Sequence, residues 1–377
     1  MRRSITILTA VILLACAWPA AGAVTGTIIT KSVNSSGYGY AVAKVWGTDY
    51  EMGYAHGYLF ATEIAKNVTW VRKAIGSLYT TTVNALATTY WPPDVQQEIQ
   101  GIVAGVKAKI PTSPVNAGDL ALLATFADWG YSAACRSHAA WGSYMPDGVA
   151  MLATRRLDRN TPTGLVVLHL LLAYDRADGH RWLNISLPGV ITAATAVRND
   201  GTLVSIHDAP ESGGARARRN VITRSMATRT LVTATNAYNG FLFLGPYKPW
   251  TGTFLNVYSP QYPAVIAADE TRGFYNLRIP QPSYFGGEVI HTSNLHTDGT
   301  FTPTDFPEVA AYYSGATPKT MADHFGLLNH VTTHDGFQLL SVAYRAPGDM
   351  TLWYQGRLSS TSTTPILALE WSSLFGE

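Results

Sequence analysis

The chain has 377 residues, 47% of them hydrophobic and 14% charged, and a formal net charge of +2. The length and hydrophobic fraction indicate a globular protein with a sizeable buried core, and the charged fraction lies below the roughly 25% usual in soluble domains. Arginines cluster only at 216–229, where they alternate with apolar residues as on the solvated face of a helix. A near-neutral chain of this kind is not expected to bind nucleic acid.

The first 23 residues have the pattern of an export signal. Arg2 and Arg3 precede an apolar run at 5–16, and a small-residue cleavage site follows at 21–23. We therefore expect a secreted protein, or one at the cell surface or in a periplasm. Cys16 offers an alternative, because it would be the acylated residue of a lipoprotein signal. No later apolar run reaches the roughly 20 residues of a spanning helix, so no membrane span is expected.

Helical patterns dominate from residue 49 to residue 131. Asp49 is placed to cap a helix whose apolar residues recur at three- and four-residue steps. Gly53 and Gly57 lie four apart on one face of that helix, so another backbone can approach it closely. Two more helices are predicted at 94–109 and 118–129, the second behind a capping-type Asn116.

After Cys135 the pattern changes to strands, with helices predicted only at 219–237 and 320–331. An Asn-Asp-Gly turn at 199–201 predicts a hairpin, and a second hairpin is expected near the C-terminus, at 337–355. Strand blocks separated by helix blocks predict an α+β fold in which helices cover the faces of sheets. No linker long enough to separate independent domains is evident.

Cys135 is the single cysteine outside the export signal. In an exported chain it has no partner within its own chain for a disulfide. One interpretation is a small buried hydrophobic residue. The other is a nucleophile, whose thiol must be activated by a base or a nearby cation, and Arg136, His138 and Arg155 are the candidates.

Four segments carry motifs, in a fixed order along the chain. Residues 47–57 read Gly-Thr-Asp-Tyr-Glu-Met-Gly-Tyr-Ala-His-Gly, 135–142 read Cys-Arg-Ser-His-Ala-Ala-Trp-Gly, 155–158 read Arg-Arg-Leu-Asp, and 291–296 read His-Thr-Ser-Asn-Leu-His. In order and spacing these segments resemble the penicillin acyltransferase-like family of N-terminal nucleophile hydrolases, which includes the isopenicillin N acyltransferases. The choloylglycine hydrolases are related more distantly.

The resemblance implies an α+β fold, a four-layer αββα sandwich with an N-terminal helical segment. It also implies that the chain cuts itself between Ala134 and Cys135, after which the helical fragment 24–134 stays bound to the catalytic chain 135–377. Cys135 then becomes a new N-terminus. Its α-amino group, with a reference pKa of about 8, accepts the proton of its own thiol.

Three further residues receive roles from the same resemblance. Asp158 is expected to hold the free α-amino group, Arg155 to line the substrate pocket, and Asn294 to donate a hydrogen bond to the tetrahedral oxyanion. From their spacing, Arg155 and Asp158 face opposite sides of a strand unless a bulge intervenes. No cofactor and no metal is expected for this chemistry.

The histidines give two further candidates. His138, close to Cys135, and His207, at a strand end before a turn, are candidate substrate-binding residues. His324, His330 and His334 fit no familiar zinc-ligand spacing and are interpreted as residues on a helix surface.

The sequence therefore predicts a self-processing cysteine hydrolase. Its substrate is expected to be a small linear amide, and the acyl group is expected to form a thioester with Cys135 before water or an amine accepts it.

Two alternatives stay open. The first is an unprocessed, inactive ligand-binding relative, because Ala134, Arg156 and Arg159 replace the Gly, Asn and aromatic residue usual in the family. The second is a papain-like peptidase with His138 or a later histidine as base. Against it, that class places its cysteine near the mature N-terminus, at the start of a helix.

Overall fold

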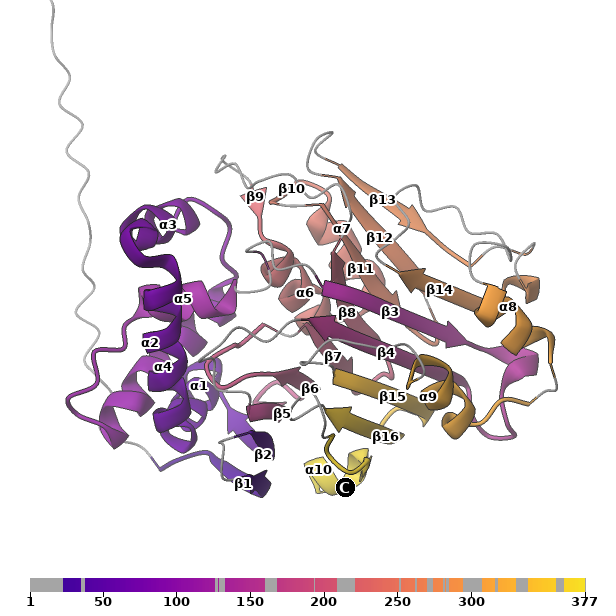
Figure 1. The fold of residues 1–377 in the computed structure, drawn as a ribbon, viewed down its shortest axis with the longest axis horizontal. Coiled ribbons are helices and arrows are strands. Elements are labelled where there is room, and N and C mark those ends of the chain that lie inside the picture. The colour runs from indigo at the N-terminus through magenta and orange to yellow at the C-terminus, as the bar shows by residue number, and fades with distance from the viewer. Residues whose placement is uncertain are drawn as a thin grey trace, which may run out of the picture.

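Two sheets packed face to face, with helices outside each, make up the fold (Figure 1). The computed structural model describes residues 23–34, 38–125, 128, 133–159, 168–192, 194–208, 221–250, 252–261, 263–269, 274–280, 282, 285–293, 307–315, 318–329, 338–356 and 363–376. The export signal predicted at 1–23 therefore lies outside the described residues except for its last position. No helix in the described ranges is long and apolar enough to cross a membrane.

The larger sheet contains nine strands within the described ranges, and only its β2–β5 pair is parallel. In their order across the sheet the strands are β1 (Gly26–Val33), β2 (Gly39–Gly47), β5 (Leu168–Arg176), β6 (Arg181–Ser186), β7 (Thr195–Arg198), β8 (Leu203–Asp208), β11 (Thr253–Tyr258), β12 (Ala264–Asp269) and β13 (Phe274–Arg278). The predicted turn at 199–201 joins β7 to β8, and Gly201 adopts a positive φ of 81° there.

The smaller sheet is antiparallel and holds Cys135. Its described strands, in order, are β14 (Val289–Ser293), β3 (Ala133–Ala140), β4 (Met151–Arg159), β15 (Gln338–Ala346), β16 (Asp349–Gly356) and β17 (Leu367–Glu370). The predicted C-terminal hairpin is β15 and β16. Two short strands, β9 (Val221–Ile222) and β10 (Lys248–Pro249), form a separate parallel pair.

Apolar side chains fill the space between the two sheets. Leu171, Leu183 and Val197 of the larger sheet share one buried cluster with Leu340 and Val342 of the smaller sheet. The short helix α10 (Trp371–Phe375) adds three side chains to the same cluster. Since both sheets contribute alternate residues to this cluster, their remaining residues face outward toward the helices.

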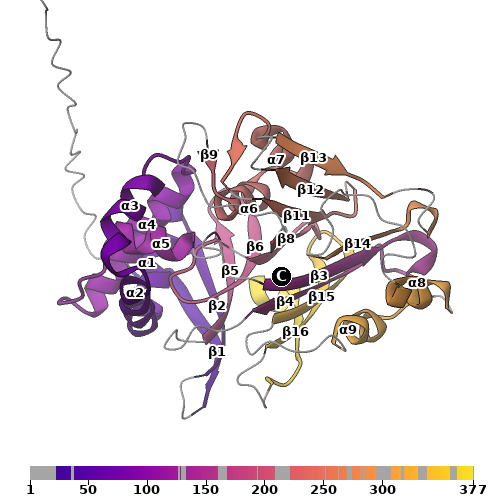
Figure 2. The same cartoon turned by 45° about the horizontal axis from the view of Figure 1, so that its top comes forward.

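Helices cover both outer faces (Figure 2). The larger sheet is covered by α1 (Asp49–Leu59), α2 (Ala61–Ile75), α3 (Tyr79–Leu86), α4 (Pro93–Lys109), α5 (Ala117–Ala124), α6 (Arg224–Thr233) and α7 (Ala237–Leu244). The smaller sheet is covered by α8 (Pro307–Ser314) and α9 (Met321–Asn329). These layers confirm the predicted αββα sandwich.

The segment 24–134 is not helical throughout. It begins with β1 and β2, which the sequence did not predict, and β2 lies between β1 and β5 in the larger sheet. Its first helix begins one residue earlier than expected, because Thr48 is the N-cap and forms a capping box with Glu51. The predicted cap at Asn116 is present and pairs with Asp119.

Glycines bring α1 and α4 into close contact. A Cβ added at Gly53 would lie 2.2 Å from the carbonyl oxygen of Glu98. A Cβ added at Gly57 would lie 2.2 Å from the carbonyl oxygen of Ile102. Gly101 of α4 makes the matching approach to α1. The close backbone approach predicted from Gly53 and Gly57 is therefore present, and α4 is the partner.

Gly101→Ala tests this packing. The new methyl group would lie 2.1 Å from the carbonyl oxygen of Tyr50, so the helices must separate. We expect a loss of about 1–3 kcal/mol in the free energy of unfolding by urea, as for overpacked cores. Gly326→Ala in α9 is the control, because open space surrounds that position and alanine favours a helix by about 1 kcal/mol. Equal stability of the two variants would contradict the close packing.

Buried arginines join the helices of 24–134 to the later chain. Arg229 of α6 forms ion pairs with Asp94 at 3.1 Å and with Glu98 of α4 at 2.8 Å, and Tyr174 donates a hydrogen bond to Glu98 at 2.7 Å. Arg224 is also buried. The interpretation of the 216–229 cluster as a solvated face is therefore wrong for these two arginines, because both are buried against acidic residues distant in sequence, Arg224 against Asp128 and Arg229 against α4.

Glu98→Gln tests the electrostatic role of this cluster. Burial raises the pKa of Glu98 from 4.5 to about 7, outweighing the attraction of Arg229. The folded chain thus holds the proton more tightly than the unfolded chain. The resulting stability is complete below pH 4.5 and is lost as pH rises to about 7. The free energy of unfolding of the wild-type chain should therefore fall by about 3 kcal/mol across that pH interval, and Glu98→Gln should abolish this decrease. Glu63→Gln, in a surface ion pair, should retain it.

Candidate active site

Cys135 lies within β3 and is buried, with 2% of its surface exposed. The antiparallel ladder with β4 places Cys135 opposite Leu157 and Ser137 opposite Arg155. Because side chains alternate along strands, Cys135, Ser137 and Arg155 share one face of the sheet. That face also carries Ala139, which belongs to the core between the sheets. The thiol therefore faces the larger sheet.

Arg155 contacts the thiol directly. Its Nη2 lies 3.3 Å from Cys135 Sγ and donates a hydrogen bond of 2.8 Å to the carbonyl oxygen of Ile206 in β8. Only 1% of Arg155 is exposed. A buried cation at this distance favours the thiolate over the thiol. Cys135 and Arg155, which the sequence predicts as the nucleophile and a candidate activating cation, are therefore in direct contact.

His207 lies on the same side of the smaller sheet as Cys135. Its Nε2 is 2.9 Å from Ser137 Oγ, and its side chain is fully buried. Burial, with the positive charge of Arg155, lowers the pKa of His207 well below its usual value, so the imidazole is neutral at physiological pH. The contact between His207 and Ser137 was not predictable from the sequence, because the two residues are 70 positions apart and come from different sheets.

His138 is separated from Cys135 by the sheet itself. It occupies the alternate face of β3, where its Nε2 lies 3.0 Å from Nδ1 of His324 in α9. Burial lowers the pKa of His138 to about 3. The structure therefore does not bring His138 to the thiol, either as a substrate-binding residue or as the base of a papain-like pair. His324 is buried rather than on a helix surface, while His330 and His334 lie outside the described residues.

The remaining candidates are described only in part. Ala134 pairs with Asp158 in the ladder between β3 and β4, and this register shows no bulge. The side chains of both residues lie outside the description, and so does the whole of Asn294, although β14 ends at the preceding residue, Ser293. The roles expected of Ala134, Asp158 and Asn294 stay predictions.

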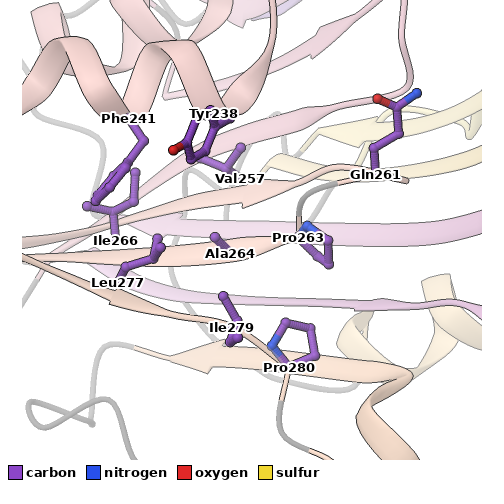
Figure 3. A pocket seen from close by; sticks show the side chains of 10 residues that line it. All are labelled: Tyr238, Phe241, Val257, Gln261, Pro263, Ala264, Ile266, Leu277, Ile279 and Pro280. Carbon is purple, nitrogen blue, oxygen red and sulfur yellow. The ribbon is translucent and has the colours of Figure 1, made fainter.

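A pocket of about 380 Å³ lies away from the thiol, between α7 and strands β11 to β13 (Figure 3). Its lining is almost entirely apolar and includes Val257 and Ile266. These two side chains belong to the core on the helix side of the larger sheet, whereas Cys135 faces the opposite side. In the described part of the chain, no group of three or more acidic, histidine or cysteine side chains is arranged to hold a metal.

Comparisons with known proteins give weak structural likenesses. No protein-family model and no curated protein matches the chain. One similar solved structure is a Caenorhabditis elegans N-acylethanolamine-hydrolyzing acid amidase ortholog, with a TM-score of 0.36 and 12% identity over 54% of this chain and 92% of that chain. Another is a mutant of the conjugated bile acid hydrolase from Clostridium perfringens, with a TM-score of 0.35 and 11% identity over 63% and 93%. At these scores neither likeness supports a conclusion on activity, which rests on this chain's own residues.

Arg155→Gln tests the role of the guanidinium. The variant keeps a hydrogen-bond donor but loses the positive charge, so the thiolate fraction of Cys135 at neutral pH should fall. The thiolate absorbs in the ultraviolet. The difference in absorbance between a protein and its Cys135→Ser counterpart, followed against pH, therefore measures that fraction. Arg156→Gln is the matched control, because Arg156 is equally buried but donates to the carbonyl oxygen of Leu328 on the other face. A titration of Arg155→Gln identical to wild type would contradict the assignment.

Proposed function

We propose that the chain is a secreted, self-processing cysteine N-terminal nucleophile hydrolase that cleaves a small linear amide. Acyl transfer to an amine in place of water is part of the same proposal. The observation that carries it is the buried contact of 3.3 Å between Arg155 Nη2 and the single cysteine outside the predicted export signal. Cys135 and Arg155 lie on paired strands in the core of an αββα sandwich.

The proposed self-cleavage begins at the peptide bond between Ala134 and Cys135. The thiolate attacks the carbonyl carbon of Ala134, the C–N bond breaks, and the acyl group passes to sulfur as the α-nitrogen takes up a proton. Water then hydrolyses this thioester, which leaves a carboxylate on Ala134 and a free α-amine on Cys135. Arg155 supports the first step by favouring the thiolate before any α-amine exists.

Turnover in the cut protein follows the same chemistry. The α-amine of Cys135 accepts the thiol proton, and the thiolate attacks the substrate carbonyl. The collapse of the tetrahedral intermediate releases the amine product and leaves an acyl-thioester, which water or another amine resolves. Asp158 is proposed to orient the α-amine, and Asn294 to donate to the oxyanion. The substrate is a small molecule, and no cofactor enters these steps.

The described contacts support retention of the N-terminal fragment after the cut. β2 pairs with β5 across the two fragments, and the ion pairs of Arg229 with Asp94 and Glu98 also cross between them. Fragment 24–134 is therefore proposed to stay bound to chain 135–377 as part of one core.

An unprocessed ligand-binding relative is the second candidate. It is favoured by the burial of Cys135 in a continuous strand and by an apolar pocket on the far side of the larger sheet. Such a protein would keep its full length and bind an apolar ligand without turnover.

Intact mass under denaturing conditions separates the two candidates. Self-cleavage should give roughly 12 kDa for 24–134 and roughly 26 kDa for 135–377, with Cys135 as the N-terminus of the larger fragment. Cys135→Ala should remain a single chain of roughly 38 kDa and show no amide turnover. Cys135→Ser is the conservative comparison, because a hydroxyl can replace the thiol at a lower rate.

Two results would contradict the proposed function. One is a wild-type chain that stays at full length and hydrolyses no amide after prolonged incubation. The other is a Cys135→Ala protein that is cut and fully active. The first result favours the unprocessed binding protein, and the second removes Cys135 from the chemistry altogether.

A further inference from the structure

A network of buried polar side chains lies beside Cys135, between the two sheets. Ser137 Oγ is 2.9 Å from His207 Nε2 and 3.0 Å from Tyr258 Oη. Tyr258 Oη in turn lies 3.2 Å from Thr292 Oγ1 and 3.4 Å from Asn256 Oδ1. Ser137 and Thr292 come from the smaller sheet and the other three from the larger one. The network therefore joins the sheets across their interface.

The surroundings of this network are largely apolar. Side chains such as Leu171, Phe254 and Leu340 fill much of the space between the sheets, which also holds a second buried polar contact, between His169 of β5 and Tyr354 of β16. Buried polar groups must find hydrogen-bond partners to avoid a loss of stability, and apolar side chains of similar volume often replace them at little cost. Stability alone thus gives little reason for a polar network here. Its position next to the thiol suggests a role at Cys135.

Two links run side by side from the smaller sheet to strand β8. The first is Arg155, whose Nη2 lies 3.3 Å from Cys135 Sγ and bonds the carbonyl oxygen of Ile206 at 2.8 Å. The second joins His207, the next residue of β8, to Ser137, which lies two residues after Cys135 on the same face. A shift of β3 against β8 would change the distance between sulfur and guanidinium. Charge stabilisation and reaction geometry both depend steeply on such distances.

We propose that His207 is a positioning residue for Cys135, acting through Ser137 to fix β3 against β8 and so to keep the thiol at Arg155. Its effect on turnover rests on the proposed function, whereas its effect on the thiol does not. A neutral imidazole suits the task, because it bonds Ser137 without placing a second buried cation beside Arg155. Tyr258 supports Ser137 from the same sheet as His207.

Three variants test the link between His207 and Ser137. His207→Phe and Ser137→Ala each remove it, while His207→Gln keeps an amide nitrogen near the position of Nε2. The first two should lower the thiolate fraction of Cys135 at neutral pH and slow self-cleavage and kcat by about tenfold or more, with a smaller effect on KM. His207→Gln should restore most of both. The double variant should be no worse than either single one, because both remove the same link.

Ser341→Ala is the matched control. Its hydroxyl is also buried and lies 2.7 Å from Thr154 Oγ1, but on the face of the smaller sheet that is turned away from Cys135. A merely structural role for Ser137 predicts the same outcome for both serine variants, namely a lowered melting temperature with an unchanged thiolate titration. The positioning role predicts a changed titration for Ser137→Ala alone.

The outcomes separate this inference from the proposed function. Folded Ser137→Ala and His207→Phe proteins that titrate like wild type overturn the positioning role. If the wild-type chain never cuts itself, the proposed function is contradicted. If the two variants still lower the thiolate fraction of Cys135 in that case, the positioning role is supported. Should both link-removing variants fail to fold, His207→Gln and His207→Asn decide, because the amide of asparagine is too short to reach Ser137. A thiolate fraction lowered in His207→Asn alone supports the role, and equal titrations of the two variants overturn it.

Discussion

The contact between Arg155 and Cys135 constrains much of the structure around it. A guanidinium that is 1% exposed destabilises the folded chain unless its donors find acceptors. The carbonyl oxygen of Ile206 supplies one, so β8 of the larger sheet must lie over β4 of the smaller sheet. The ladder between β3 and β4 then sets which residues of β3 face the same space. The contact between the cysteine and its neighbouring cation therefore depends on how the two sheets pack.

The two segments on either side of Cys135 are interleaved rather than stacked as separate domains. β2 belongs to the sheet of the later chain, and α4 supplies Glu98 and Asp94 to Arg229 of α6. Figure 1 shows α1 to α5 gathered at one end of the molecule, over β1, β2 and β5. A cut within β3 would leave these contacts in place, because none of them depends on continuity at Cys135. Self-cleavage is thus compatible with an intact core.

The sequence could predict elements whose signals are local. Prolines at 92–93 and at 111 bound the predicted helix at 94–109, which is observed as Pro93–Lys109, and the turn at 199–201 predicts the hairpin of β7 and β8. β1 and β2 were not predicted, since β2 is placed by its pairing with β5, more than 100 residues later in the chain, and β1 by its pairing with β2. Burial of Arg229 and His324 was missed for the same reason, as their partners are distant in sequence. The pairing of Cys135 with Arg155 was predictable from motif order, but the pairing of Ser137 with His207 was not.

The alternation of β3 decides which neighbours of Cys135 can take part in its chemistry. His138 is only three residues away, yet it lies under α8 and α9 against His324, with the sheet between it and the thiol. His207 is 72 residues away in number and nevertheless holds the residue next to Cys135 on the same face. From Cys135 onward, odd-numbered positions of β3 face the larger sheet, and even-numbered positions face the helices. When a cysteine lies on the inner face of one of two packed sheets, a histidine can act on it only if its side chain reaches that same face. The face of the sheet is therefore a better guide to the role of a histidine than its closeness in sequence.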